Sequence, residues 1–172
     1  LNESRGTGLD PEIVFNPAGG AQRIPYLVSL LSGQSLSLVV FLDDEKGARR
    51  VAREQMIKKK LIREDDVLFA SEPLSDDRDA DIEDLLGQEV FHRLVLESYA
   101  DELEGRDLEV DERIPRIVVR YEEAFSNQGL DFHHTRPARL FLREFPKNPE
   151  EYLSEVAVAR FESVFRTVEG RF

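Results

Sequence analysis

The chain has 172 residues, of which 41% are hydrophobic and 34% are charged, as is typical of a globular protein with a buried core. It contains no Cys, which excludes disulfides, zinc–thiolate sites and cysteine nucleophiles, and which favours a cytoplasmic location. No apolar run approaches the ~20 residues of a membrane-spanning helix, and the sequence predicts neither a signal peptide nor a membrane partner. Because the first residue is Leu1 rather than Met, we expect the chain to be part of a longer protein.

In the first part of the chain, predicted strands alternate with predicted helices. Residues 36–42 form a nearly continuous apolar run, which suits a strand buried on both faces. Together with its neighbours it predicts an α/β fold with a central parallel sheet flanked by helices. The predicted elements are a strand at 12–17, a helix at 24–31, a strand at 36–42, a helix at 48–57 and a strand at 67–71.

The second part of the chain shows only helical periodicity after about residue 81. We therefore expect an α/β domain over residues 1–100 and a mostly helical extension over residues 101–172 that packs on it. The apolar spacing predicts helices at 82–94, 114–125, 138–143 and 153–168.

Three consecutive acids follow the predicted strand at 36–42: Asp43, Asp44 and Glu45. Ligands of parallel α/β sheets bind beyond the carboxyl ends of the strands, and carboxylates gathered there suit a hard divalent cation. A bound Mg²⁺ or Mn²⁺ would offset the repulsion between the three charges. The alternative interpretation is a solvated turn followed by a helix N-terminus, where acids are also favoured.

A second acidic element, Asp81, Glu83 and Asp84, follows the predicted strand at 67–71. If both elements lie at the same edge of the sheet, their carboxylates could share a metal site. The alternative is that Asp81 caps a helix while Glu83 and Asp84 occupy its first turn.

The net charge of −12 argues against phosphate-rich partners, but the charge is unevenly distributed. Residues 46–63 contain eight Lys or Arg and a single acid, Glu54. This basic stripe is either a surface for a DNA backbone or a solvated helix face. The candidate DNA-binding residues are Arg49, Arg50, Arg53 and Lys58.

The strand that ends in acids resembles two families. In a response-regulator receiver, an acidic pair at a strand end binds Mg²⁺, which makes a receiver-like Mg²⁺-binding domain one alternative. A receiver also carries a phosphoacceptor Asp at a later strand end, and here the corresponding window, residues 84–94, predicts a helix. That mismatch argues against a receiver.

The second resemblance covers nearly the whole chain. "GLDPEIVFNPAGGAQRIPYLVSLLSG", "LSLVVFLDDEKGARRVAREQMIKK" and "DADIEDLL" resemble, in this order, segments of the TOPRIM nuclease region of the OLD (overcoming lysogenisation defect) family. The helical tail that ends in "VARFESVFRTVEGRF" is also similar. The resemblance implies a TOPRIM Rossmann-like fold and a metal-dependent DNA endonuclease or nickase.

The resemblance also implies roles for individual residues. Asp43 and Glu45 match the Asp-x-Asp pair as catalytic residues and metal ligands, with Glu in place of the second Asp. Glu83 and Asp84 match the later acidic element, and Asp81 is a further candidate ligand. Arg136 stands where the family has a basic group, although it is equally compatible with a surface position. Two Mg²⁺ or Mn²⁺ ions would support phosphodiester hydrolysis.

Other parts of the family pattern have no counterpart in the chain. A TOPRIM domain opens with a strand and a catalytic Glu in a pattern like Val-Glu-Gly-x-x-Asp, which we expect upstream of Leu1. The resemblance further implies an upstream ABC-type ATPase domain, homo-oligomers formed through that domain, and defence against phage. A primase- or topoisomerase-like TOPRIM and a catalytically degenerate domain for assembly or signalling remain alternatives.

Overall fold

The computed structural model describes residues 9–34, 36–74 and 78–172, which divide into two compact units. Unit 1 contains the described residues before Arg78 together with Arg160–Phe172, and unit 2 contains Arg78–Ala159. The chain is a mixed α/β protein, 54% helical, with a two-stranded parallel sheet in its described part. The domain boundary expected at residue 100 stays a prediction. Among the described residues, no helix is long and apolar enough to cross a membrane.

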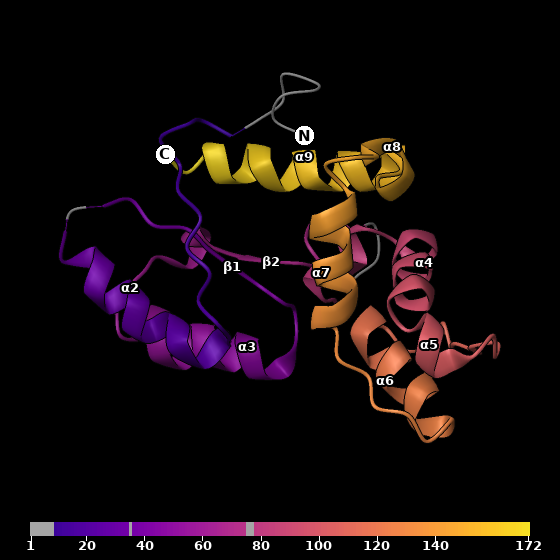
Figure 1. The fold of residues 1–172 in the computed structure, drawn as a ribbon. Coiled ribbons are helices and arrows are strands. Elements are labelled where there is room, and N and C mark those ends of the chain that lie inside the picture. Colours follow the sequence, from indigo (N-terminus) through magenta and orange to yellow (C-terminus); the bar gives the residue numbers. More distant parts are fainter. Residues whose placement is uncertain (1–8, 35, 75–77) are drawn as a thin grey trace. The chain divides into compact units, whose positions relative to one another are not determined.

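The sheet lies in unit 1 and pairs β1 (Val40–Leu42) with β2 (Val67–Phe69), Val40 standing opposite Val67. Side chains of a strand alternate between its two faces, so the sheet buries two separate clusters. One face packs against α2 (Ile24–Ser32) and the helix that follows β1, and the other against the C-terminal part of α9 (Glu155–Glu169) (Figure 1). The first cluster is formed by Ile24, Val28, Val40, Leu42, Ala48, Ala52, Met56 and Val67, and the second by Leu9, Leu68 and Val168 with Phe41, Val164 and Phe165.

The helix after β1 consists of α3 (Lys46–Val51), which continues directly into a π-helical turn, η2 (Ala52–Ile57). Its apolar positions are buried against the sheet, while its Arg and Lys side chains are exposed. The segment ends at Lys60, whose φ of 56° is left-handed and reverses the chain toward β2. Short 3-10 turns, η1 (Ala21–Arg23) and η3 (Glu64–Asp66), precede α2 and β2.

Unit 2 is helical and is built around an aromatic cluster. Tyr99 and Phe125 meet edge to face with ring centroids 4.6 Å apart, and Phe91 and Tyr121 do so at 5.2 Å. The ring of Phe132 lies tilted beside them, with its centroid 5.1 Å from that of Phe125. The elements are η4 (Ile82–Leu85), α4 (Gln88–Ser98), α5 (Ala100–Leu103), α6 (Ile117–Asn127), α7 (Thr135–Glu144) and α8 (Pro149–Tyr152).

The strand predicted at residues 12–17 is wrong. The side chain of Asp10 accepts a hydrogen bond from the backbone N–H of Glu12 at 2.8 Å, and its carbonyl accepts one from Ile13 at 2.9 Å, which forms a turn instead. Val14 and Phe15 are 84% and 69% exposed. Without a neighbouring strand, apolar residues alone do not make a strand. The strand predicted at 36–42 is shorter than expected and begins at Val40.

Candidate functional site

Each member of the first acidic element has a different environment in unit 1. Asp43 directly follows β1 and is half-buried, whereas Asp44 is only 3% exposed. Glu45 is the N-cap of α3, and its Oε1 accepts a hydrogen bond from the backbone N–H of Ala48 at 2.9 Å. Glu45 therefore lies at a helix N-terminus, as the alternative interpretation predicted. The capping bond uses only Oε1, one of its two carboxylate oxygens.

The structural role of Asp44 was not predicted from the sequence. The Arg49 guanidinium donates to both of its oxygens, at 2.7 Å for Oδ2, and the Ser71 hydroxyl donates to Oδ2 as well. Burial alone would raise the pKa of Asp44, but the hydrogen bonds from Arg49 and Ser71 outweigh it and lower the pKa. Asp44 therefore neutralises Arg49 of α3 and links α3 to the turn after β2.

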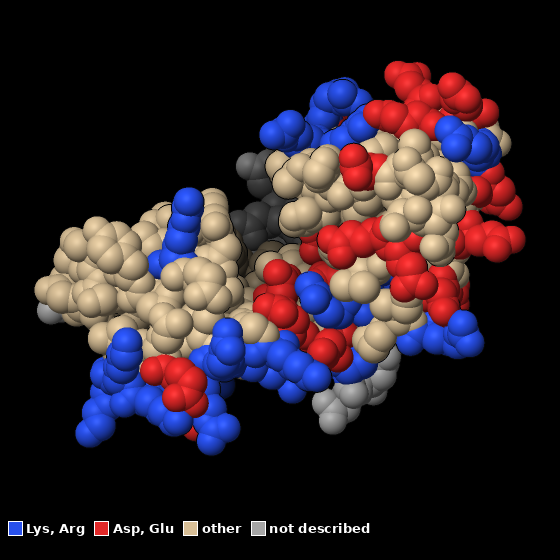
Figure 2. All heavy atoms as spheres, turned by 90° about the horizontal axis from the view of Figure 1, so that it is seen from below, with Lys and Arg blue, Asp and Glu red and all other residues tan. Residues whose placement is uncertain are grey.

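The basic stripe is an exposed surface of α3, η2 and the turn after η2, which we call the basic face: Arg49, Arg50, Arg53, Lys58, Lys59 and Lys60. Figure 2 shows Lys and Arg side chains gathered over this part of unit 1, with a few acidic atoms among them. Two members have acidic partners, since Arg49 pairs with Asp44 and Lys58 with Glu54 at 2.7 Å. Within the described residues, the structure shows no ion pair for Arg50, Arg53, Lys59 or Lys60. The positive charges of these four side chains could therefore contact an anionic partner.

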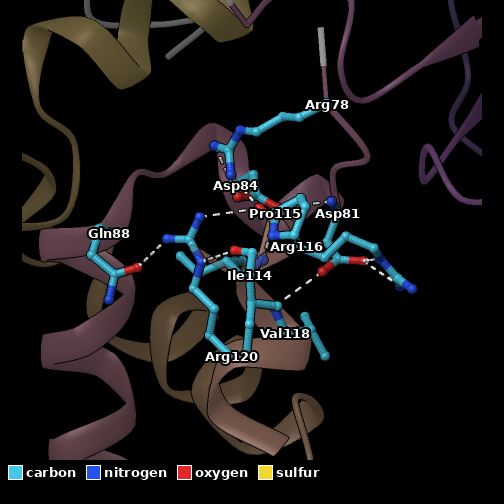
Figure 3. A network of polar contacts seen from close by, with 10 residues as sticks. Arg78, Asp81, Asp84, Gln88, Ile114, Pro115, Arg116, Val118 and Arg120 are labelled. Atoms are coloured by element: carbon cyan, nitrogen blue, oxygen red, sulfur yellow. Dashed lines mark hydrogen bonds and ion pairs between the residues drawn. The ribbon is translucent and has the colours of Figure 1, made fainter. Parts of the chain in front are cut away.

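The second acidic element lies in unit 2, where Asp81 is the N-cap of η4 and Asp84 lies in its first turn. Both carboxylates are only 2% exposed. Asp81 Oδ1 accepts from the Arg116 guanidinium at 2.8 and 2.5 Å, and its Oδ2 accepts from the backbone N–H of Val118 at 3.0 Å. The helix-cap interpretation of Asp81 is confirmed, and its carboxylate also reaches α6 (Figure 3).

Asp84 has an equally complete set of partners. Its Oδ2 accepts from the backbone N–H groups of Asp81 at 2.8 Å and Ile117 at 3.1 Å, and its Oδ1 lies 3.3 Å from the Arg78 guanidinium. Burial raises the pKa of Asp84 against the opposing effect of these donors. Glu83 is half-buried, and its Oε1 lies 2.9 Å from Nδ1 of His134.

The same network contains a buried cation that the sequence analysis did not identify. Arg120 is 8% exposed and donates to the carbonyls of Ile114 and Pro115 at 2.6 and 3.1 Å. It also donates to Oε1 of Gln88 at 2.8 Å (Figure 3). The apolar spacing of the predicted helix at 114–125 did not indicate a buried Arg, because Arg120 lies outside the stripe formed by Ile114, Val118, Tyr121 and Phe125.

Arg136, the predicted basic catalytic group, connects the helices of unit 2. Its guanidinium donates to Glu102 at 2.5 and 3.2 Å and to the carbonyl of Ser98 at 2.7 Å. It also lies 3.9 Å from the centroid of the Tyr99 ring, within cation–π distance. These contacts account for an Arg at this position by packing α7 against α4 and α5, and a catalytic role for Arg136 stays a prediction.

The two acidic elements differ in how well they fit a divalent cation. Asp43 and Glu45 place carboxylate oxygens just after β1, at the carboxyl end of a parallel strand, and this donor chemistry would suit Mg²⁺ or Mn²⁺. The four carboxylate oxygens of Asp81 and Asp84 already contact guanidinium or backbone N–H groups, so these two residues do not fit as ligands. Among the described residues, no group of three or more His, Asp or Glu side chains is placed to hold a metal ion.

Two surface cavities are lined by residues outside both acidic elements. A cavity of about 520 Å³ in unit 2 is lined by residues between Asp107 and Gln128. Another of about 540 Å³ in unit 1 is lined by residues between Ser32 and Asp66 together with Arg171. Because the elements belong to different units, their expected convergence on one site stays a prediction. In comparisons with known proteins, no family model, no curated protein and no solved structure matches the chain.

Proposed function

We propose that the chain is the DNA-contacting part of a metal-dependent nuclease that cuts or nicks DNA. The observation that carries the proposal is the basic face. It begins on α3, the helix that directly follows the acids at the end of β1. Arg50 and Arg53 are exposed there, and the structure shows no ion pair for either among the described residues. A phosphate backbone is a partner for such a face even in a chain with a net charge of −12.

The proposed cation site is formed by Asp43 and Glu45, with a Glu expected upstream of Leu1. A divalent cation at this place would supply an activated water and would relieve the charge of the leaving oxygen. The protein contributes ligands fixed at a strand end and a neighbouring cationic surface that holds the substrate. Glu45 caps α3, since its Oε1 accepts from the backbone N–H of Ala48 at 2.9 Å, and it would also help Asp43 to hold the cation.

The remaining expectations rest on the family resemblance. We propose an upstream ABC-type ATPase domain as partner, homo-oligomers formed through it, a cytoplasmic location and a role in phage defence. The resemblance in the order of three sequence segments supports these proposals. Sequencing upstream of Leu1 tests the resemblance on which they rest, because a TOPRIM domain would open there with an apolar strand that ends in Glu-Gly.

The nuclease proposal is tested by plasmid nicking with Mn²⁺, using a protein extended upstream of Leu1. We expect nicking by the native protein, no nicking but retained DNA binding by Asp43→Ala, and weakened DNA binding by the double variant Arg50→Glu/Arg53→Glu. Arg139→Glu reverses one exposed charge in unit 2 and serves as the control for a charge reversal outside the basic face. Equal DNA binding by the double variant and its control would reject the basic face as the DNA surface.

A second candidate function is a catalytically degenerate TOPRIM-like module for assembly or signalling. It is favoured by the partners of Asp81 and Asp84, which leave these carboxylates no oxygen for a cation. The same assay separates the two functions, because a degenerate module gives no nicking with any divalent metal even after the upstream extension.

A further inference from the structure

The N-terminus of α6 is closed by side chains that come from far away in the sequence. The first N–H groups of a helix have no acceptor within the helix and are usually satisfied by a nearby Ser, Thr, Asp or Asn. Arg116 stands at the N-cap of α6 and makes no side-chain capping bond. Instead, Ile117 N–H donates to Asp84 at 3.1 Å and Val118 N–H donates to Asp81 at 3.0 Å.

The two aspartates are also tied to each other and to two guanidinium groups. Asp84 accepts from the N–H of Asp81 at 2.8 Å, which fixes the turn of η4. Arg116 pairs with Asp81 at 2.5 Å, and Arg78 with Asp84 at 3.3 Å, so two buried negative charges face two positive ones. The positive end of the α6 dipole lies at the same place and further favours carboxylates.

A divalent cation would have to displace these contacts. Carboxylates that bind Mg²⁺ or Mn²⁺ direct oxygen lone pairs at the ion, and a guanidinium against the same oxygens opposes the cation by charge. Removing either carboxylate from its present partners would leave buried N–H groups unsatisfied, which is costly. The contacts of Asp81 and Asp84 with guanidinium and backbone N–H groups therefore oppose cation binding by these two carboxylates.

We infer that Asp81 and Asp84 form a carboxylate clasp that holds η4 to the N-terminus of α6, and that neither is a ligand of the cation proposed for Asp43 and Glu45. The second half of this inference rests on the proposed function, and the first half stands without it. It replaces the expected pair of acidic metal sites by one candidate cation site, in unit 1, and one structural clasp, in unit 2.

Thermal unfolding in EDTA and in Mn²⁺ tests the clasp, followed by circular dichroism on the full chain. We expect Asp81→Ala and Asp84→Ala to lower the Tm by roughly 4–10 °C, equally with and without Mn²⁺. Asp84→Asn keeps one acceptor oxygen and the shape of the side chain, so its Tm loss is smaller and keeps the test open if the Ala variants do not fold. Glu122→Gln, an exposed acid of α6, is the matched control and leaves the Tm unchanged.

Amide hydrogen exchange gives a second measurement that distinguishes the clasp from a metal ligand, because the clasp predicts faster exchange at the first amides of α6 even without metal. Asp84→Asn or Asp84→Ala is expected to speed exchange at Ile117, and Asp81→Ala at Val118. If Mn²⁺ raises the Tm of the native chain and this rise is lost in Asp84→Asn but kept in Asp43→Ala, the inference is overturned. If Mn²⁺ leaves the native Tm unchanged, the proposed cation site fails, while the losses in EDTA still test the clasp.

Discussion

At the scale of single residues, two buried aspartates show how surroundings decide the behaviour of identical side chains. Asp44 accepts from Arg49 and Ser71, and these hydrogen bonds lower its pKa although burial opposes them. Asp84 is surrounded mainly by backbone donors, and burial raises its pKa. The sequence contains several acids at both places but does not show which of them is buried. Side chains alternate between two faces only within a strand, and both acidic elements lie beyond the strand ends.

These opposite shifts predict opposite dependences of stability on pH. A lowered pKa of Asp44 stabilises the fold above the ordinary aspartate range, and this contribution is lost as the pH falls through the folded pKa. A raised pKa of Asp84 favours the fold at low pH, and that contribution is lost as the pH rises through the folded pKa. Urea unfolding of Asp44→Asn and Asp84→Asn at pH 3, 5 and 7 measures both.

The expected cost of Asp44→Asn at pH 7 is about 1–2 kcal/mol in the free energy of unfolding, because Arg49 is half exposed and solvent screens its charge. The difference between the native chain and Asp44→Asn should grow from pH 3 to pH 7, and the difference for Asp84→Asn should shrink. Glu64→Gln, which changes an exposed acid, is expected to show neither trend. Parallel trends for the two Asn variants would contradict the assignment.

At the scale of elements, the helices were the most predictable part of the fold. The apolar spacing at 24–31 corresponds to α2, and that at 138–143 lies within α7. The helix predicted from residue 114 begins at Ile117, because its N-terminus is set by Asp81 and Asp84, more than thirty positions earlier. A cap formed by residues so distant in the sequence cannot be recognised from the local pattern. The strand predicted at 12–17 failed for a related reason, because a strand also needs a partner from elsewhere in the chain.

Glu45 permits a test that separates helix capping from metal binding. Glu45→Ala should remove the hydrogen bond to Ala48 and cost about 1 kcal/mol of stability, and Glu45→Ser should restore most of it because Ser is a preferred N-cap. Neither variant should bind Mn²⁺ as the native chain does. The measurements are urea unfolding in EDTA and calorimetric titration with Mn²⁺. Native-like Mn²⁺ affinity in Glu45→Ser would remove Glu45 from the proposed cation site.

At the scale of the whole molecule, charge is segregated along the sequence. Net charge alone argued against DNA, yet the single acid within residues 46–63 leaves a cationic face on an anionic protein. The predicted helix side with apolar residues opposite is confirmed for Arg49, Arg50 and Arg53, whereas Lys58, Lys59 and Lys60 lie in the turn after η2. Which of its charges are already used could not be predicted, because Asp44 reaches Arg49 across a turn and Lys58 selects Glu54 on its own helix.

This segregation predicts how DNA binding depends on salt. If Arg50, Arg53, Lys59 and Lys60 each contact a phosphate, log K should fall against log salt with a slope of about three to four, at about 0.9 per contact. Arg50→Glu/Arg53→Glu should reduce that slope by about two. Fluorescence anisotropy with a labelled duplex between low and physiological salt measures it. A slope near zero would show that the basic face does not meet the backbone.

The aromatic cluster of unit 2 has a practical consequence for spectroscopy. The chain has four Tyr and no Trp, so its intrinsic emission comes from tyrosine alone. Tyr99, Tyr121 and Tyr152 are at most 4% exposed and belong to unit 2, whereas Tyr26 of unit 1 is 71% exposed. Solvent quenchers should therefore dim Tyr26 first, and the emission that survives them reports almost entirely on the integrity of unit 2.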